Sequence, residues 1–96
     1  MKENRSGKAS GRKVAAALKY RQGEDVAPRL VAKGMGNIAE RIIEAAREAG
    51  VPLYEDTDLC TLLMTLNLDE QIPANMYAAV AEVMAFVYRL NRSQSA

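Results

Sequence analysis

The clearest hydrophobic pattern in the chain lies near its C-terminus, over residues 72–90. Apolar side chains recur there at spacings of three and four, at Met76, Val80, Val83, Met84, Val87 and Leu90. This spacing places them on one stripe of an α-helix, the side that must be buried. Pro73 suits the first turn, because the amide that it lacks would be unpaired there. The pattern predicts a long final helix against which the rest of the chain packs.

Two further stretches show the same helical period. The first covers residues 37–49, with Asn37 as the expected N-cap and Gly50 as the C-terminal stop. Its apolar face comprises Ile38, Ile42, Ile43, Ala46 and Ala49. The second covers residues 58–66, capped by Asp56 or Thr57. Its apolar face comprises Leu59, Leu62, Leu63 and Leu66. Both stretches are expected to be helices with one buried side.

Three other stretches favour β-strands. Residues 14–20 alternate at a period of two, residues 29–33 form a short apolar run, and residues 51–55 follow Gly50. Residues 21–25 are expected to be a loop, and Gly34, Met35 and Gly36 a tight turn. A strand, a helix and another strand predict a right-handed parallel crossover. The predicted fold class is α/β (α+β), with a small mixed three-stranded sheet, three helices and a long C-terminal helix.

Charged residues are distributed unevenly along the chain, although its net charge is only +1. Residues 1–13 hold five basic side chains and one acid, so the remainder carries eight basic and eleven acidic groups. Residues 1–12 read as a disordered basic tail, 13–91 as one folded domain and 92–96 as a frayed C-terminus. A nucleic-acid-binding protein usually has a basic face on the fold itself, so no nucleic acid is expected. The alternative is an anion- or RNA-binding protein that uses the tail and the helix start at residues 34–37.

Residues suited to catalysis or to metal binding are scarce. There is no histidine, and Cys60 is the only cysteine, which points to an inert thiol and to no disulfide. No zinc or calcium motif is present, and no cofactor is expected. The acids Glu55, Asp56, Asp58, Asp69 and Glu70 could bind a cation, but helix-start charges and solvated turns account for them more simply. No uncharged apolar run is long enough for membrane insertion, so a cytoplasmic location is expected.

Several short segments, in order and at matching spacing, resemble the cytoplasmic domain of the FlhB family of flagellar export-switch proteins. They are ALKY (17–20), AP (27–28), VAKG (31–34), IAERI (38–42), GVPLYED (50–56), IP (72–73) and YAAVAEVMAFVYRL (77–90). The YscU and EscU proteins of injectisomes are relatives in this family. The resemblance covers about residues 14–90. It implies a domain at the type III export gate, and here a stand-alone variant without the family's membrane region.

The resemblance also implies a lost reaction. Family members carry an Asn-Pro-Thr-His loop whose Asn side chain cyclises and cuts the chain. The matching positions here are Ser10, Gly11, Arg12 and Lys13. A serine hydroxyl cannot form the succinimide, so this degenerate cleavage loop is expected to be inactive and the protein not to be an enzyme.

The resemblance further implies that this chain keeps the family's docking surface. The family's proposed subunit-binding patch is a shallow apolar pocket, and its matching positions are Ala27, Pro28, Ala81 and Met84. All four are apolar, as a pocket for a short hydrophobic motif requires. The expected partners are export substrates of the rod and hook type, or cytoplasmic components of the export gate. The expected function is therefore that of a non-cleaving binding module that can associate peripherally with the export apparatus.

Overall fold

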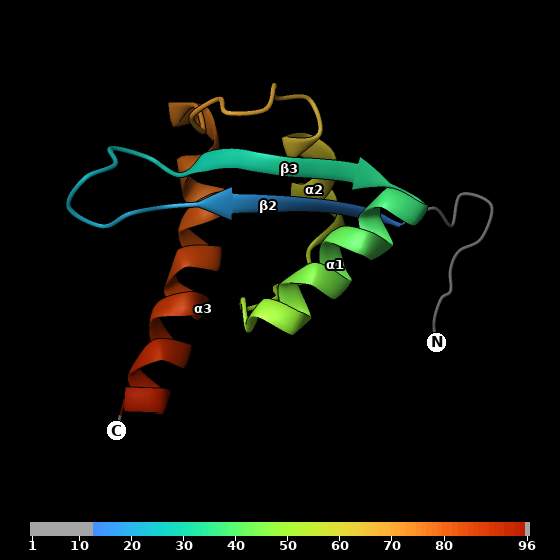
Figure 1. Ribbon diagram of the computed structural model, residues 1–96. Coiled ribbons are helices and arrows are strands. Elements are labelled where there is room, and N and C mark those ends of the chain that lie inside the picture. Colours follow the sequence, from blue (N-terminus) through green and yellow to red (C-terminus); the bar gives the residue numbers. More distant parts are fainter. Residues whose placement is uncertain (1–12, 96) are drawn as a thin grey trace.

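The computed structural model describes residues 13–95, with the side chains of residues 13–92. The basic tail expected over residues 1–12 lies outside the described residues. The elements, in chain order, are β2 (Val14–Lys19), β3 (Arg29–Met35), α1 (Asn37–Ala49), α2 (Thr57–Leu63), the short 3-10 helix η1 (Ala74–Met76) and α3 (Tyr77–Ser95) (Figure 1). The expectation of a mixed α/β fold with three helices and a long C-terminal helix is confirmed, and α3 continues past residue 91.

The sheet within the described residues is a two-stranded antiparallel hairpin of β2 and β3. Val14 lies opposite Met35 and Lys19 opposite Arg29, with a bulge at Ala17 and Leu18 that skips one residue of β3. The loop expected at residues 21–25 is confirmed as a turn. Gly23 adopts a φ of 88° there, a conformation that a side chain would strain.

Two expectations about the sheet are wrong. Residues 51–56 have no regular secondary structure and pair with no strand among the described residues, so the described sheet has two strands and no parallel crossover. Periodicity identified a segment that suits a strand, but it could not show whether a neighbouring strand is available. The expected turn is also shorter, because Gly34 and Met35 belong to β3 and only Gly36, at φ 60°, turns the chain.

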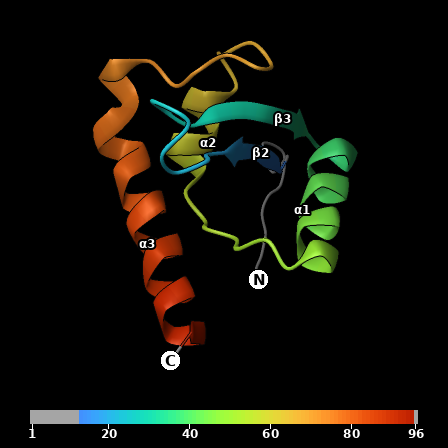
Figure 2. The ribbon, with the colours of Figure 1, turned by 60° about the vertical axis from the view of Figure 1, so that its left-hand side comes forward.

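The sheet lies between α1 on one face and α2 with α3 on the other (Figure 2). The main core is on the α2 and α3 side. Its buried members are Leu30, Leu59, Leu63, Leu66, Ile72, Met76 and Val80. Ala16 and Leu18 of β2 pack against this core, as their alternation predicted, and so do Val83 and Met84 of α3. Apolar side chains on α2 therefore meet those of the sheet and of α3 in one cluster.

Helix α1 approaches the sheet closely at Gly34. A Cβ atom there would overlap the side chain of Ile38, so this position has no room for a larger residue. Asn37 is not the N-cap as expected. Gly36 is, without any side-chain cap, and the helix ends at Gly50 in the left-handed conformation, as predicted. The expected apolar face is only partly correct, because Ile38 is 56% exposed and Ala39 is fully buried.

Helix α2 is fixed at both ends. The carboxylate of Asp56 accepts a hydrogen bond from the amide of Leu59 at 3.1 Å, which confirms Asp56 as the cap. Past the other end, the ammonium of Lys33 donates to the carbonyls of Met64 and Leu66 at 3.1 and 2.5 Å. Lys33 therefore ties β3 to the C-terminal end of α2, where a positive charge is favourable.

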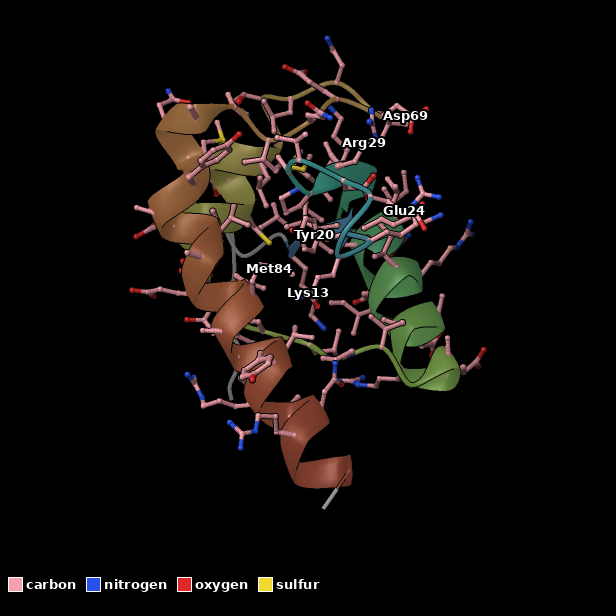
Figure 3. All side chains as sticks on the ribbon, turned by 90° about the vertical axis from the view of Figure 1, so that its left-hand side faces the viewer. Lys13, Tyr20, Glu24, Arg29, Asp69 and Met84 are labelled. Carbon is pink, nitrogen blue, oxygen red and sulfur yellow. The ribbon has the colours of Figure 1, made fainter. Side chains whose placement is uncertain are left out.

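The stretch that precedes α3 runs along the start of β3. The Leu30 amide donates to the Glu70 carbonyl at 3.0 Å, and the Asp69 amide donates to the Leu30 carbonyl at 2.6 Å. The Arg29 side chain also reaches the carbonyl of Asp69 at 2.6 Å (Figure 3). These bonds fix where the chain enters η1 and α3. They thereby set the position of α3 against the end of the hairpin.

Candidate docking pocket

A shallow hollow of about 320 Å³ lies between the hairpin loop and the first turns of α3. Its lining residues are Tyr20, Val26, Ala27, Pro28, Tyr77, Val80, Ala81 and Met84. All four residues that the sequence singled out for docking are among them. The structure therefore brings together two segments separated by more than fifty positions in the chain. Their role in docking stays a prediction.

The hairpin side of the pocket is held in place by backbone hydrogen bonds. The carbonyl of Pro28 accepts from the amide of Ile72 at 2.9 Å, which joins the loop to the stretch before α3. At the other end of the loop, the amide of Arg21 donates to the Asp25 carboxylate at 2.8 Å. This bond, more than any other interaction, holds the pKa of Asp25 below its usual value. The wall made by Pro28 is consequently built on a fixed loop.

Ala27 and Pro28 contribute to the site differently. Ala27 is only 2% exposed, so it belongs to the floor of the pocket and not to an open loop surface. Pro28 is half-buried and forms part of the wall. Ala27 is therefore buried although it lies in a loop, because this loop folds back onto α3.

Helix α3 supplies the opposite wall. Val80 is buried and belongs to the main core, while Ala81 beside it is exposed. Met84 is half-buried and packs against the core cluster as well as lining the pocket. Met84 thus serves both as core and as surface, and its flexible thioether suits a wall that must adapt to different side chains.

The sequence reasoning missed the rim of the pocket. Tyr20, directly after β2, and Tyr77, at the start of α3, are both partly exposed and line the hollow with Val26. In Figure 3, Tyr20 lies beside Met84. Val26 could have been assigned to the rim from the sequence, because a valine next to Ala27 and Pro28 in a polar loop is itself unusual. The two tyrosines could be assigned only once the hairpin end and the first turn of α3 were placed together.

The pocket offers binding without reaction chemistry. No acid, base, thiol or histidine lines it, and its only side-chain polar groups are the two tyrosine hydroxyls. An apolar side chain of a partner would lose little hydration by entering, and a neighbouring peptide group could reach a phenol. The arrangement suits recognition of a short, mostly apolar segment.

Most of the degenerate cleavage loop falls outside the described part of the chain. Ser10, Gly11 and Arg12 are not described, and only Lys13 can be placed. The carbonyl of Lys13 accepts from the amide of Gly36 at 2.8 Å, and its ammonium lies 3.9 Å from the Glu40 carboxylate. Both partners belong to the start of α1. This helix start therefore has one amide already occupied and a carboxylate beside it, which disfavours the anion-binding alternative.

The remaining candidate residues do not assemble into a site. Cys60 is half-buried, and burial raises the pKa of its thiol, which agrees with an unreactive cysteine. Across residues 13–95, no group of acidic, cysteine or histidine side chains is arranged to hold a metal ion. Among the helices of this described region, none is long and apolar enough to cross a bilayer.

Comparison with known proteins identifies the family to which this domain belongs. Its fold matches the crystal structure of the cytoplasmic domain of FlhB from Shewanella putrefaciens with a TM-score of 0.77 and 35% identity, over 85% of this chain and 68% of that one. The fold is thus that of a small α/β domain of the kind found in flagellar export proteins. Residues 12–87 match the FlhB HrpN YscU SpaS Family, and the chain belongs to this family.

Two relatives show how much of a family member this chain represents. It is 46% identical to the uncharacterized protein YlqH of Bacillus subtilis (strain 168), over 82% of this chain and 85% of YlqH. It is 44% identical to the flagellar biosynthetic protein FlhB of Yersinia enterocolitica, over 81% of this chain but only 21% of FlhB. The chain therefore spans about a fifth of the FlhB proteins that it resembles, and nearly all of YlqH.

Proposed function

We propose that this protein is a binding module of flagellar or type III protein export, acting in the cytoplasm at the export gate. It would dock export substrates, or cytoplasmic parts of the gate, through the pocket between the hairpin loop and α3. The observation that carries the proposal is the convergence of Ala27, Pro28, Ala81 and Met84 around one hollow in a chain of this family. FlhB is a flagellar biosynthetic protein, and the matching domain of FlhB is cytoplasmic.

The size and openness of the pocket bear on its affinity. One apolar side chain of a partner, such as Leu or Phe, would contribute roughly 1.5–3 kcal/mol on burial. The loss of translational freedom and the ordering of the partner segment offset much of this gain. A dissociation constant of tens of micromolar or weaker follows. Weak binding suits a station at which many subunits must arrive and leave.

The proposal is tested by titrating isotope-labelled protein with rod or hook subunits and following backbone amide shifts. Shifts should cluster at residues 26–28 and 77–84. Pro28→Asp should weaken binding at least about tenfold, because it places a charge where an apolar anchor should sit. The Pro28 carbonyl that bonds Ile72 is retained in this variant. Shifts confined to other faces, with undiminished binding by Pro28→Asp, would assign docking elsewhere.

We also infer that the protein does not cleave itself and is not an enzyme. The inference rests on Ser10 and Gly11, which stand where family members have the cyclising Asn and the Pro. Intact-mass measurement after several days at neutral pH should return one polypeptide. Two fragments separating between Ser10 and Gly11 would refute it.

A further inference from the structure

One flank of α3 continues the docking pocket down the helix. Tyr77, Ala81 and Met84 line the hollow and follow one another at steps of four and three residues. A further step of four reaches Tyr88, which is 59% exposed and lies beyond the hollow. In Figures 1 and 3, α3 continues well past the hairpin. We call Tyr77, Ala81, Met84 and Tyr88 the α3 stripe. At about 1.5 Å per residue it spans about 16 Å.

The α3 stripe carries no charge, although three of its four residues are exposed. Between Tyr77 and Tyr88 the only charged residue is Glu82, which about 3.6 residues per turn place away from the stripe. Exposed sides of surface helices normally carry charged or polar side chains. Charged side chains return only past the end of the stripe, where the Arg92 guanidinium lies 5.7 Å from the centre of the Tyr88 ring. An uncharged flank that continues an apolar hollow indicates a surface that a partner covers.

We propose that the α3 stripe receives an amphipathic helix of the docked partner, which lies along α3 and inserts one apolar side chain into the hollow. This inference rests on the proposed docking function and specifies the form in which an export substrate or gate component binds. Steps of four, three and four residues are those of a seam between two packed helices. Ala81, a small residue within the stripe, lets a second helix approach to about 8–10 Å between axes.

An extended segment suits this surface less well than a helix. Beyond its first turn, α3 uses its main-chain amides and carbonyls for its own hydrogen bonds, so it offers none to an incoming strand. A strand on the stripe would leave the main-chain groups that face α3 unpaired, and the two tyrosine hydroxyls of the hollow are too few to replace their partners. A helix pairs its own main-chain groups and presents only side chains to the stripe.

A second copy of this chain does not supply the side chain that the hollow requires. If two α3 stripes packed antiparallel, each hollow would face the Ala81 and Met84 of the other copy. Ala81 is too short to fill a hollow, and Met84 already packs against its own core cluster. Residues 1–12 do not fit either, since their only apolar members are Met1 and Ala9. A separate protein with an amphipathic helix is the occupant that fits.

The dimensions of the stripe determine what the partner helix must look like. About 16 Å corresponds to three helical turns, so about eleven residues suffice. The side that faces α3 is apolar at steps of three and four, with a large residue such as Leu, Met or Phe at the hollow. Because Arg89 is exposed near the end of the stripe, an acidic residue at that end of the partner helix is favourable.

The test titrates full-length protein into an isotope-labelled rod or hook subunit. Pro28→Asp alters the hollow, Tyr88→Asp alters the stripe beyond the hollow, and Ala79→Asp is the matched control. Ala79 is exposed and lies on the other flank of the same helix. Calorimetry measures the affinities, and thermal unfolding checks that each variant is folded. The carbon chemical shifts of the bound subunit segment report whether it is helical or extended.

Affinity should fall at least about tenfold for both Pro28→Asp and Tyr88→Asp and change less than about twofold for Ala79→Asp, and the bound segment should be helical. If only Pro28→Asp loses affinity, or if the bound segment is extended, docking at the pocket stands and the helix inference is overturned. No binding, or undiminished binding by Pro28→Asp, would contradict the docking function and the inference with it. Contacts of the stripe with residues 1–12 or with a second copy in the free protein would assign the stripe to that occupant instead.

Discussion

The two faces of the sheet are packed by different means. On the α2 and α3 face, large side chains such as Leu30, Ile72 and Val80 interlock, and Leu30 is fully buried. On the α1 face, the buried residues of the two strands and the helix are small, namely Ala15, Gly34 and Ala39. One face is stabilised by the apolar area that it buries. The other depends on a close approach of helix and sheet, which only small residues permit.

This difference explains where a binding site can form. The large-residue core anchors the first turns of α3 and the end of the hairpin through Val80 and Ile72. The pocket sits directly on this rigid base, so its walls are held in place before a partner arrives. Among the described residues, the α1 face has no comparable cluster of large buried side chains, and Ile38 on α1 is 56% exposed.

The largest effect is expected from truncating the centre of the large-residue face. Leu30→Ala should lower the free energy of unfolding by about 2–5 kcal/mol, because it leaves a cavity where no neighbour can easily collapse. The adjacent Val31→Ala is the matched control, since Val31 is 42% exposed and should change stability by less than about 1 kcal/mol. Urea denaturation of both variants measures the difference. Equal losses would show that the core does not centre on Leu30.

A middle-sized effect is expected on the small-residue face. Gly34→Ala should cost about 1–3 kcal/mol, because the new methyl group overlaps Ile38 and forces α1 away from the sheet. Backbone strain does not contribute, since Gly34 is not among the residues with positive φ. Ile38→Ala in the same chain should recover part of the loss, which a double-mutant cycle on thermal unfolding measures. Simple additivity would indicate that helix and sheet do not meet there.

The smallest changes in stability are expected from removing one charged side chain on each face of the sheet. Lys33→Met should cost about 1–2 kcal/mol, because two carbonyls at the end of α2 lose a charged donor. Glu40→Gln on the other face should cost less than about 1 kcal/mol, since its pairing with Lys13 is 3.9 Å long and exposed. Chemical denaturation at low salt distinguishes them. A greater loss for Glu40→Gln would reverse the ranking of the two faces.

Local sequence signals predicted where helices and their caps lie better than they predicted which segments pair or pack with one another. The helical periods of residues 58–66 and 72–90 identified two real helices, although α2 ends at Leu63 and α3 begins only at Tyr77, after η1. The Asp56 cap and the Gly50 stop depend on neighbours within one turn, and both are present. The strand at residues 51–55 was predicted wrongly, because pairing depends on a second segment that no local pattern reveals. The N-cap was misplaced by one residue, because Gly36 turns the chain immediately before Asn37.

For the pocket, too, some features could be predicted from the sequence and others depend on how distant segments pack. The four docking positions came from the family resemblance, and the structure brings them together. The burial of Ala27 and the rim tyrosines could not be predicted, because they depend on where the hairpin end lies relative to α3. The exposure of Leu62 could not be predicted either. Leu62 shares the leucine spacing of α2, but its side chain is 42% exposed. Spacing gives the face of a helix, but not how far the covering element extends.

The central claim is that the pocket on the rigid face docks export substrates, and one matched pair of variants tests it most directly. Ala81 lines the pocket, while Ala79, two residues earlier on α3, is also exposed and does not line it. Both changes to Asp place the same charge on the same helix. Calorimetric titration with a rod or hook subunit should show affinity lost at least about tenfold for Ala81→Asp and retained for Ala79→Asp, with both variants equally stable. Equal affinities for the two variants would contradict the account.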